Sequence, residues 1–169
     1  AGITDVFAAS EAPDLRNRDY DLAIVLSRSG TTTEAIEVAT ALRGRVPVLA
    51  IVADTETPLP GLADHTIAMP FADETSVVQT RFATAALTLL RAGLGIDVAP
   101  SIDDAVAALA APLPEAAVTA EQITFLGSGW AVGLAHEAAL KNREASQSWT
   151  ESYPAMEYRH GPIAIAAPG

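Results

Sequence analysis

Two stretches of the 169-residue chain combine residue types that could do chemistry, and the first is LSRSGTTTEA, residues 26–35. It places five hydroxyl side chains and one glycine between an apolar run and a helical pattern. A helix N-terminus presents unpaired amide groups and a partial positive charge, so it can hold a phosphate group. Glycine lets the backbone approach an anion, and the hydroxyls add donors. We therefore predict a phosphate site at Ser27, Ser29, Gly30 and Thr32; the alternative is an ordinary capped turn.

The second stretch is AHEAALKNREASQSWTESYPAMEYRHGP, residues 135–162. On a helix, Glu137, Lys141 and Glu144 fall on one narrow stripe, because they are spaced at i, i+4 and i+7. A carboxylate beside a lysine in a cleft is a candidate general base, whereas the same spacing on a surface gives ordinary ion pairs. His160 precedes Gly-Pro and is either a proton carrier or a histidine that ends a short helix begun by Pro154. His65 and His136 are expected to be structural.

Alternating strand and helix patterns must position these residues. Apolar runs predict fully buried strands over residues 22–26 and 46–52 and a brief strand over residues 65–69. Helices are expected from about residue 35 to Gly44 and from a Ser76 cap to about Leu94. A linker and a small helix, residues 102–110, lead to a new strand over residues 122–126 and a helix over residues 131–146. This order predicts an α/β fold with a parallel sheet flanked by helices.

Composition excludes several classes of function. The formal net charge of −11 repels polyanions, so we expect no nucleic-acid partner. Without cysteine the chain has no disulfide, thiolate metal site or cysteine nucleophile, which fits a reducing cytoplasm. No apolar run reaches membrane-spanning length. We expect a cytoplasmic protein with no cofactor, no metal and no membrane partner.

The two stretches together resemble the sugar isomerase (SIS) domain family. SRSGTTTEA resembles the family's Ser-x-Ser-Gly-x-Thr phosphate loop. The second stretch resembles the catalytic segment in the isomerase half of glucosamine-6-phosphate synthases and of related phosphosugar isomerases and deaminases. The positions that match its motif are Glu137, Lys141, Glu144, Glu151 and His160. Ala138 and Tyr158 depart mildly from the family pattern, which has glycine and leucine there.

The resemblance implies a flavodoxin-like SIS fold and a tandem of two such domains. Residues 1–94 would be the later part of the first domain, residues 95–120 a linker with a short helix, and residues 121–169 the first part of the second. The family's Schiff-base lysine has no counterpart in these 169 residues.

The resemblance also implies a reaction: proton transfer between C1 and C2 of a hexose 6-phosphate through an enediol or enolamine. The hydroxyl loop would anchor the phosphate, Glu144 would carry the proton, and His160 would move protons at the ring oxygen. Lys141 would stabilise developing negative charge or orient Glu144, with Glu137 and Glu151 in support. The family's shared active sites imply a homodimer. Ketose/aldose isomerase, deaminase, aminotransferase and deglycase all remain open, and the alternative is a non-catalytic domain of a regulator that senses sugar phosphates.

Overall fold

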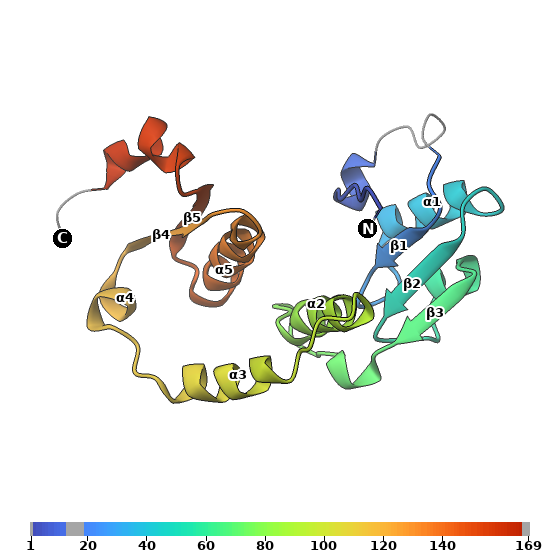
Figure 1. Ribbon diagram of the computed structural model, residues 1–169, viewed down its shortest axis with the longest axis horizontal. Helices are drawn as coiled ribbons and strands as arrows, with labels where there is room; N and C mark the ends of the chain where they lie inside the picture. Colours follow the sequence, from blue (N-terminus) through green and yellow to red (C-terminus); the bar gives the residue numbers. More distant parts are fainter. Residues whose placement is uncertain (1, 13–18, 167–169) are drawn as a thin grey trace. The chain divides into compact units, whose positions relative to one another are not determined.

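The computed structural model describes residues 2–12 and 19–166 and divides the chain into two compact units (Figure 1). The first unit is Ala1–Asp97 and the second is Val98–Gly169. Among the described residues, none of the helices has the length and apolar character that a membrane crossing requires.

The first unit is built on a three-stranded parallel sheet in the order β1-β2-β3. Its strands are β1 (Ala23–Leu26), β2 (Val48–Val52) and β3 (His65–Ala68), with Leu26 beside Ile51 and Val52 beside Ala68. Helix α1 (Thr33–Leu42) and helix α2 (Arg81–Gly93) complete the layers. Short 3-10 turns are η1 (Ala9–Glu11), η3 (Leu59–Leu62) and η4 (Pro70–Ala72).

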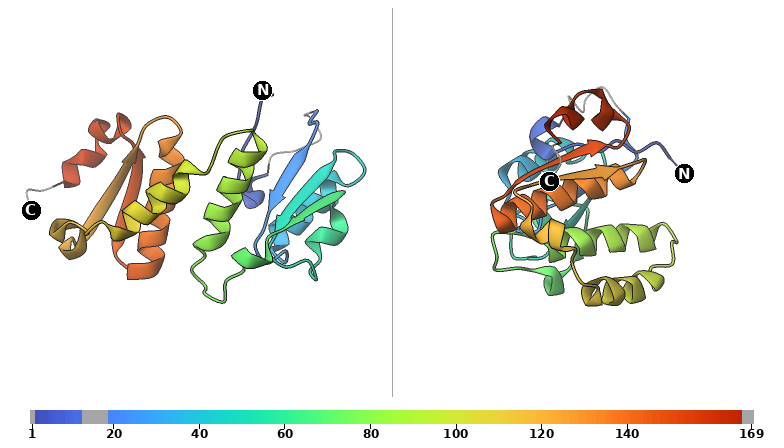
Figure 2. Two further views of the ribbon diagram at one scale, coloured as in Figure 1. Left: turned by 60° about the horizontal axis from the view of Figure 1, so that its bottom comes forward. Right: turned by 90° about the vertical axis from the view of Figure 1, so that its left-hand side faces the viewer.

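The two faces of β2 belong to two different apolar clusters. Val48, Ala50 and Val52 pack with buried residues of α1, whereas Ile51 packs with Phe82 and Ala86 of α2. Because successive side chains of a strand point to opposite faces, α1 and α2 cover opposite sides of the sheet. The predicted parallel sheet flanked by helices is confirmed (Figure 2).

The second unit begins with α3 (Pro100–Ala110) and α4 (Glu115–Thr119) and contains one strand–helix–strand crossover. Strand β4 (Gln122–Gly127), helix α5 (Ala131–Ser146) and strand β5 (Trp149–Pro154) form it, with β4 and β5 parallel. Two 3-10 turns follow, η5 (Glu157–His160) and η6 (Pro162–Ile165). Helix α5 packs on the strands through buried Ala135 and Ala139, and the Thr150 hydroxyl donates to the Ala139 carbonyl at 2.6 Å.

The prediction that residues 22–26 form a fully buried strand is wrong. Ile24 and Leu26 keep 45% and 48% of their surface exposed. β1 is an edge strand, and the cluster under α2 includes Ile51 and Ile67 but no residue of β1. The face of β1 that carries Ile24 and Leu26 therefore lacks the cover that β2 receives.

Two helix boundaries also differ from prediction. Helix α2 begins at Arg81 and not at Ser76, because the Glu74 carboxylate accepts the amide hydrogens of Thr80, Arg81 and Phe82. No helix begins at Pro154, which is the last residue of β5. The polar run of β5 gave no strand signal, and its pairing with the apolar β4 is what makes it a strand.

The capping role of Glu74 predicts a pH-dependent part of the stability. Desolvation raises the pKa of Glu74, but hydrogen bonds from the backbone of Thr80, Phe82 and Arg81 outweigh it, so the pKa lies below its ordinary 4.5. Such a group stabilises the fold above its ordinary pKa, and this stability is lost as the pH falls through the folded-state value. We expect Glu74→Gln to be less stable than the parent at neutral pH and the difference to shrink below pH 4.5.

Denaturant unfolding over a pH series would measure this difference. Glu37→Gln is a matched control, because Glu37 lies exposed on α1 and its side chain makes no hydrogen bond or ion pair within the described residues. A Glu74→Gln effect of the same size at neutral pH and at about pH 3 would contradict the capping role.

Candidate functional site

The predicted phosphate residues lie in one turn at the carboxyl end of β1. Ser27 is buried, and its Oγ lies 3.0 Å from Thr32 Oγ1 and accepts the Gly30 amide hydrogen at 3.2 Å. Ser29 Oγ accepts the amide and the hydroxyl of Thr31 at 3.2 and 2.9 Å. The structure thus brings Ser27, Ser29, Gly30 and Thr32 together, as the sequence predicted.

Gly30 is required at its position for two reasons. Its φ of +61° lies in the left-handed region, which side chains rarely adopt. A Cβ atom there would also overlap Thr57 Oγ1 from the loop after β2. That loop is fastened to Gly30, since the Leu59 amide donates to the Gly30 carbonyl at 3.2 Å. The glycine therefore allows the loop after β2 to close against the turn.

The first turn of α1 has amide groups that no side chain caps within the described residues. Thr32 is the N-cap residue and makes no capping side-chain hydrogen bond; instead its hydroxyl lies beside that of Ser27. The first amides of a helix lack carbonyl partners within the helix and attract an anion. The turn therefore offers hydroxyl and amide donors side by side, which suits a phosphate ester.

Arg28 lies in the same turn and is a functional candidate that the sequence prediction did not include. Its side chain does not extend into solvent; it is only 22% exposed. Nη1 donates to Asp73 Oδ1 at 2.9 Å and to the Glu74 carbonyl at 2.7 Å. Because Asp73 lies 45 residues further along the chain, no local pattern could have shown this contact.

The charged stripe on α5 is present as predicted. Lys141 Nζ lies 2.6 Å from Glu144 Oε2 and 3.9 Å from Glu137 Oε1. The Lys141 side chain is 22% exposed, and the two carboxylates are 36% and 38% exposed. One ammonium group therefore holds two carboxylates on one helix face, and Glu144 is the closer of the two.

Glu144 and His160 lie at opposite ends of the second sheet. Helix α5 runs back along β4, so its last turns lie near the start of β5 (Figure 1). Glu144 belongs to these last turns, whereas His160 is the last residue of η5, which follows the end of β5. A six-residue strand spans roughly 17 Å between its first and last Cα atoms. Among the described residues, no hydrogen bond or ion pair links His160 to the α5 stripe. One copy of the chain does not bring this base and this histidine together.

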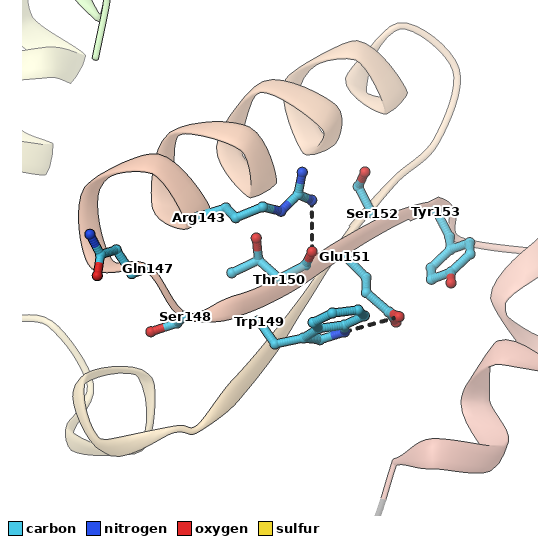
Figure 3. Close-up of a pocket in the computed structure, with 8 residues that line it drawn as sticks. All are labelled: Arg143, Gln147, Ser148, Trp149, Thr150, Glu151, Ser152 and Tyr153. Atoms are coloured by element: carbon cyan, nitrogen blue, oxygen red, sulfur yellow. Dashed lines mark hydrogen bonds between the residues drawn. The ribbon is translucent and has the colours of Figure 1, made fainter. Parts of the chain in front are cut away.

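Glu151 lies on the face of β5 that points away from α5 (Figure 3). Thr150 and Ser152 face the helix, where Ser152 Oγ lies 2.7 Å from His136 Nδ1. Alternation then puts Glu151 on the other face, and its Oε1 accepts the Trp149 indole hydrogen at 3.3 Å. Glu151 is therefore not in contact with Glu144.

A pocket of about 610 Å³ opens beside β5, and its lining residues run from Arg143 through β5 to Tyr153 (Figure 3). Desolvation raises the pKa of Tyr153, and the nearby Glu151 carboxylate raises it further, since it disfavours a second negative charge. Trp149, Glu151 and Tyr153 form the outward face of the strand. The charged stripe of α5 does not line this pocket.

The chain is similar in sequence to several isomerising glutamine–fructose-6-phosphate aminotransferases. One of them, from Pyrobaculum aerophilum, is 36% identical to the chain over 178 residues. The aligned region covers 92% of this chain and 29% of that protein. No protein-family model matches the chain. It spans about 30% of the length of the curated relatives that it matches.

Solved structures agree with the sequence relatives. Glucosamine-6-phosphate deaminase from Thermotoga maritima matches with a TM-score of 0.72 and 27% identity, covering 92% of this chain and 52% of that one. The C-terminal domain of glucosamine-fructose-6-phosphate aminotransferase from Francisella tularensis matches with a TM-score of 0.62 and 24% identity, covering 93% and 52%. Fold and sequence together confirm the resemblance that the two motifs predicted: the chain carries parts of the SIS fold and is related to the isomerising aminotransferases and phosphosugar enzymes of that family.

Proposed function

We propose that the chain belongs to an enzyme that isomerises a hexose 6-phosphate by moving a proton between C1 and C2 through an enediol or enolamine. The observation that carries this proposal is the Lys141–Glu144 pair at 2.6 Å, on a chain related to isomerising aminotransferases. Transfer or release of an amino group is an additional step that the relatives' names suggest. The domain organisation that we propose is the predicted one, with residues 1–94 and 121–169 in successive SIS domains joined by residues 95–120.

The turn at residues 27–32 is the proposed phosphate anchor. Its donors are the open amides of α1 and the hydroxyls of Ser29 and Thr32, while the buried Ser27 holds the turn in shape. An anchored phosphate fixes the orientation of the reacting carbons and so lowers the barrier by positioning. Since amide dipoles and hydroxyls do the binding, the acidic composition of the chain is no obstacle.

The proton transfer is assigned to Glu144. Lys141 holds its carboxylate in place and offers a positive charge to the oxygen on which negative charge develops during enolisation. Glu137 lies on the other side of Lys141, and Glu151, which accepts the Trp149 indole hydrogen, is the second residue assigned a supporting role.

His160 is assigned to proton transfer at the ring oxygen in the site of a partner subunit. Its separation from Glu144 within one copy supports this assignment and favours a homodimer with shared sites. We place the enzyme in the cytoplasm, in keeping with a chain that has no cysteine.

The phosphate anchor predicts selective stabilisation by a phosphorylated sugar. Fructose 6-phosphate should raise the melting temperature of the protein, while fructose at the same concentration should not, because only the ester engages the turn at residues 27–32. Thermal unfolding with each sugar measures this directly. Ser29→Ala combined with Thr32→Ala is the matched variant and should lose the response. Equal shifts with both sugars would rule out the anchor.

A further inference from the structure

Arg28 spans the carboxyl edge of the first sheet. Its backbone follows β1, and its carbonyl accepts the amide hydrogen of Ala53, the residue after β2, at 3.0 Å. Its guanidinium reaches Asp73 and Glu74, which follow β3. One residue thus follows β1, contacts the residue after β2 and reaches the segment that comes after β3 and η4, at the edge where parallel sheets bind their ligands.

The acceptor segment is itself tied to α2. Asp73 Oδ1 accepts the Glu74 amide hydrogen at 3.0 Å as well as the Arg28 bond. The Glu74 carboxylate then receives the amides at the start of α2, with the shortest bond, 2.8 Å, from Arg81. A continuous set of hydrogen bonds therefore runs from the hydroxyl turn through Arg28, Asp73 and Glu74 to the N-terminus of α2.

This arrangement is not one that stability alone would select. Arg28 Nε is buried and has no hydrogen-bond partner within the described residues. A buried donor without an acceptor costs free energy, so its retention calls for an explanation. The long side chain also loses rotamer freedom when it is held in place. The contact holds the second residue of the turn that runs from Ser27 to Gly30.

We propose that Arg28 is a positioning residue for phosphate binding: by fastening the turn at residues 27–32 to Asp73 and Glu74, it holds the hydroxyl and amide donors in their binding geometry. The inference rests on the proposed function of that turn. Arg28 acts here through the hydrogen bonds of its guanidinium group to Asp73 and Glu74, which we call the Arg28 tie, and not through its net charge. A turn that is already held in place loses less conformational entropy when a ligand binds, so the ligand binds more tightly.

Asp73→Ala separates the two roles. It removes the carboxylate that accepts from Arg28 Nη1, leaves the Glu74 carbonyl as the remaining acceptor, and keeps the positive charge near the turn. If Arg28 positions the turn, Asp73→Ala should weaken fructose 6-phosphate binding by roughly three- to tenfold. If Arg28 acts by charge, loss of the opposing carboxylate should leave binding unchanged or tighten it. Glu56→Ala is the matched control, since it removes an exposed carboxylate that follows β2 and whose side chain makes no hydrogen bond or ion pair within the described residues.

Arg28→Lys gives a second test, because lysine keeps the charge but lacks the length and the planar donor group. It should weaken binding as much as Asp73→Ala, and the double variant should be no weaker than either single one. Calorimetry on the full chain measures all of these affinities. Parental affinity in Asp73→Ala or in Arg28→Lys would overturn the inference.

Amide hydrogen exchange in the absence of ligand keeps this test separate from that of the proposed function. The tie predicts faster exchange over residues 28–33 in Asp73→Ala than in the parent and in Glu56→Ala. If the parent protein does not bind fructose 6-phosphate, the proposed function fails. Amide hydrogen exchange then still tests whether the Arg28 tie holds the turn in place. Unchanged exchange over residues 28–33 would overturn it.

Discussion

Glu144→Gln is expected to lower turnover of a hexose 6-phosphate by about 100- to 10,000-fold, the usual contribution of a positioned general base. That loss corresponds to roughly 3 to 5 kcal/mol of barrier. Glutamine keeps the shape and the hydrogen-bonding reach of Glu144 but cannot take up the proton. Exchange of the substrate's C1 or C2 proton with deuterated water should disappear together with turnover.

Binding of the substrate should change little in this variant, because the proposed anchor lies on a different segment of the chain. The fold should also persist, since the Lys141–Glu144 pair is partly exposed and such pairs contribute at most about 1 kcal/mol. Calorimetry for binding and NMR for proton exchange, both on the same preparation, give the comparison. Glu115→Gln in the first turn of α4 is a suitable control, because Glu115 is exposed and is assigned no role in the reaction.

The competing interpretation of the α5 stripe makes the opposite prediction. If Glu137, Lys141 and Glu144 are only surface ion pairs, Glu144→Gln should exchange the substrate proton at the parental rate. Parental exchange with intact binding would remove Glu144 from the catalytic residues. It would then favour the alternative that the chain senses sugar phosphates without reacting with them.

Local patterns predicted the parts of the fold that depend on neighbouring residues. Helix α5 occupies the predicted residues 131–146, and the hydroxyl turn lies between β1 and α1, because apolar spacing and the turn residues act over a few positions. The i, i+4, i+7 stripe follows from helix geometry alone, so the contacts of Lys141 with both carboxylates were predictable.

Features that depend on distant partners were not predictable in this way. The exposure of Ile24 and Leu26 follows from the place of β1 at the edge of the sheet, which an apolar run does not reveal. The α2 boundary depends on the Glu74 carboxylate, six residues before Thr80. Arg28 meets Asp73 because the parallel strands put the end of β1 and the segment after β3 at the same edge of the sheet.

The separation of Glu144 from His160 has the same origin. The two residues are only 16 positions apart, yet the crossover from α5 into β5 sends them to opposite ends of the sheet. Their spacing matches the motif named in the sequence analysis, but it does not correspond to a contact within one copy of the chain. The motif spacing therefore predicted two candidate site residues but not their separation within one copy of the chain.

Gly30→Ala should be the most damaging single-methyl change in the first unit. A left-handed backbone costs an alanine about 1 to 2 kcal/mol, and the added Cβ would overlap Thr57 Oγ1. Overpacking of this kind adds about 1 to 3 kcal/mol. We therefore expect unfolding free energy to fall by roughly 2 to 5 kcal/mol. Fructose 6-phosphate affinity should fall by roughly tenfold to 100-fold, because a shift of about 1 Å is enough to disturb a positioned site.

Gly44→Ala separates the two costs. Gly44 has a similar φ of +74°, but an added Cβ would have no neighbour within 4 Å, and the residue lies beyond the C-terminal end of α1. This variant should lose only about 1 kcal/mol of stability and keep its affinity. Denaturant unfolding and calorimetry on both variants test the difference. Equal losses of stability, or parental affinity in Gly30→Ala, would mean that closure of the loop after β2 against Gly30 does not shape the phosphate turn. A larger loss confined to Gly30→Ala would tie the glycine at residue 30 to the geometry that ligand binding requires.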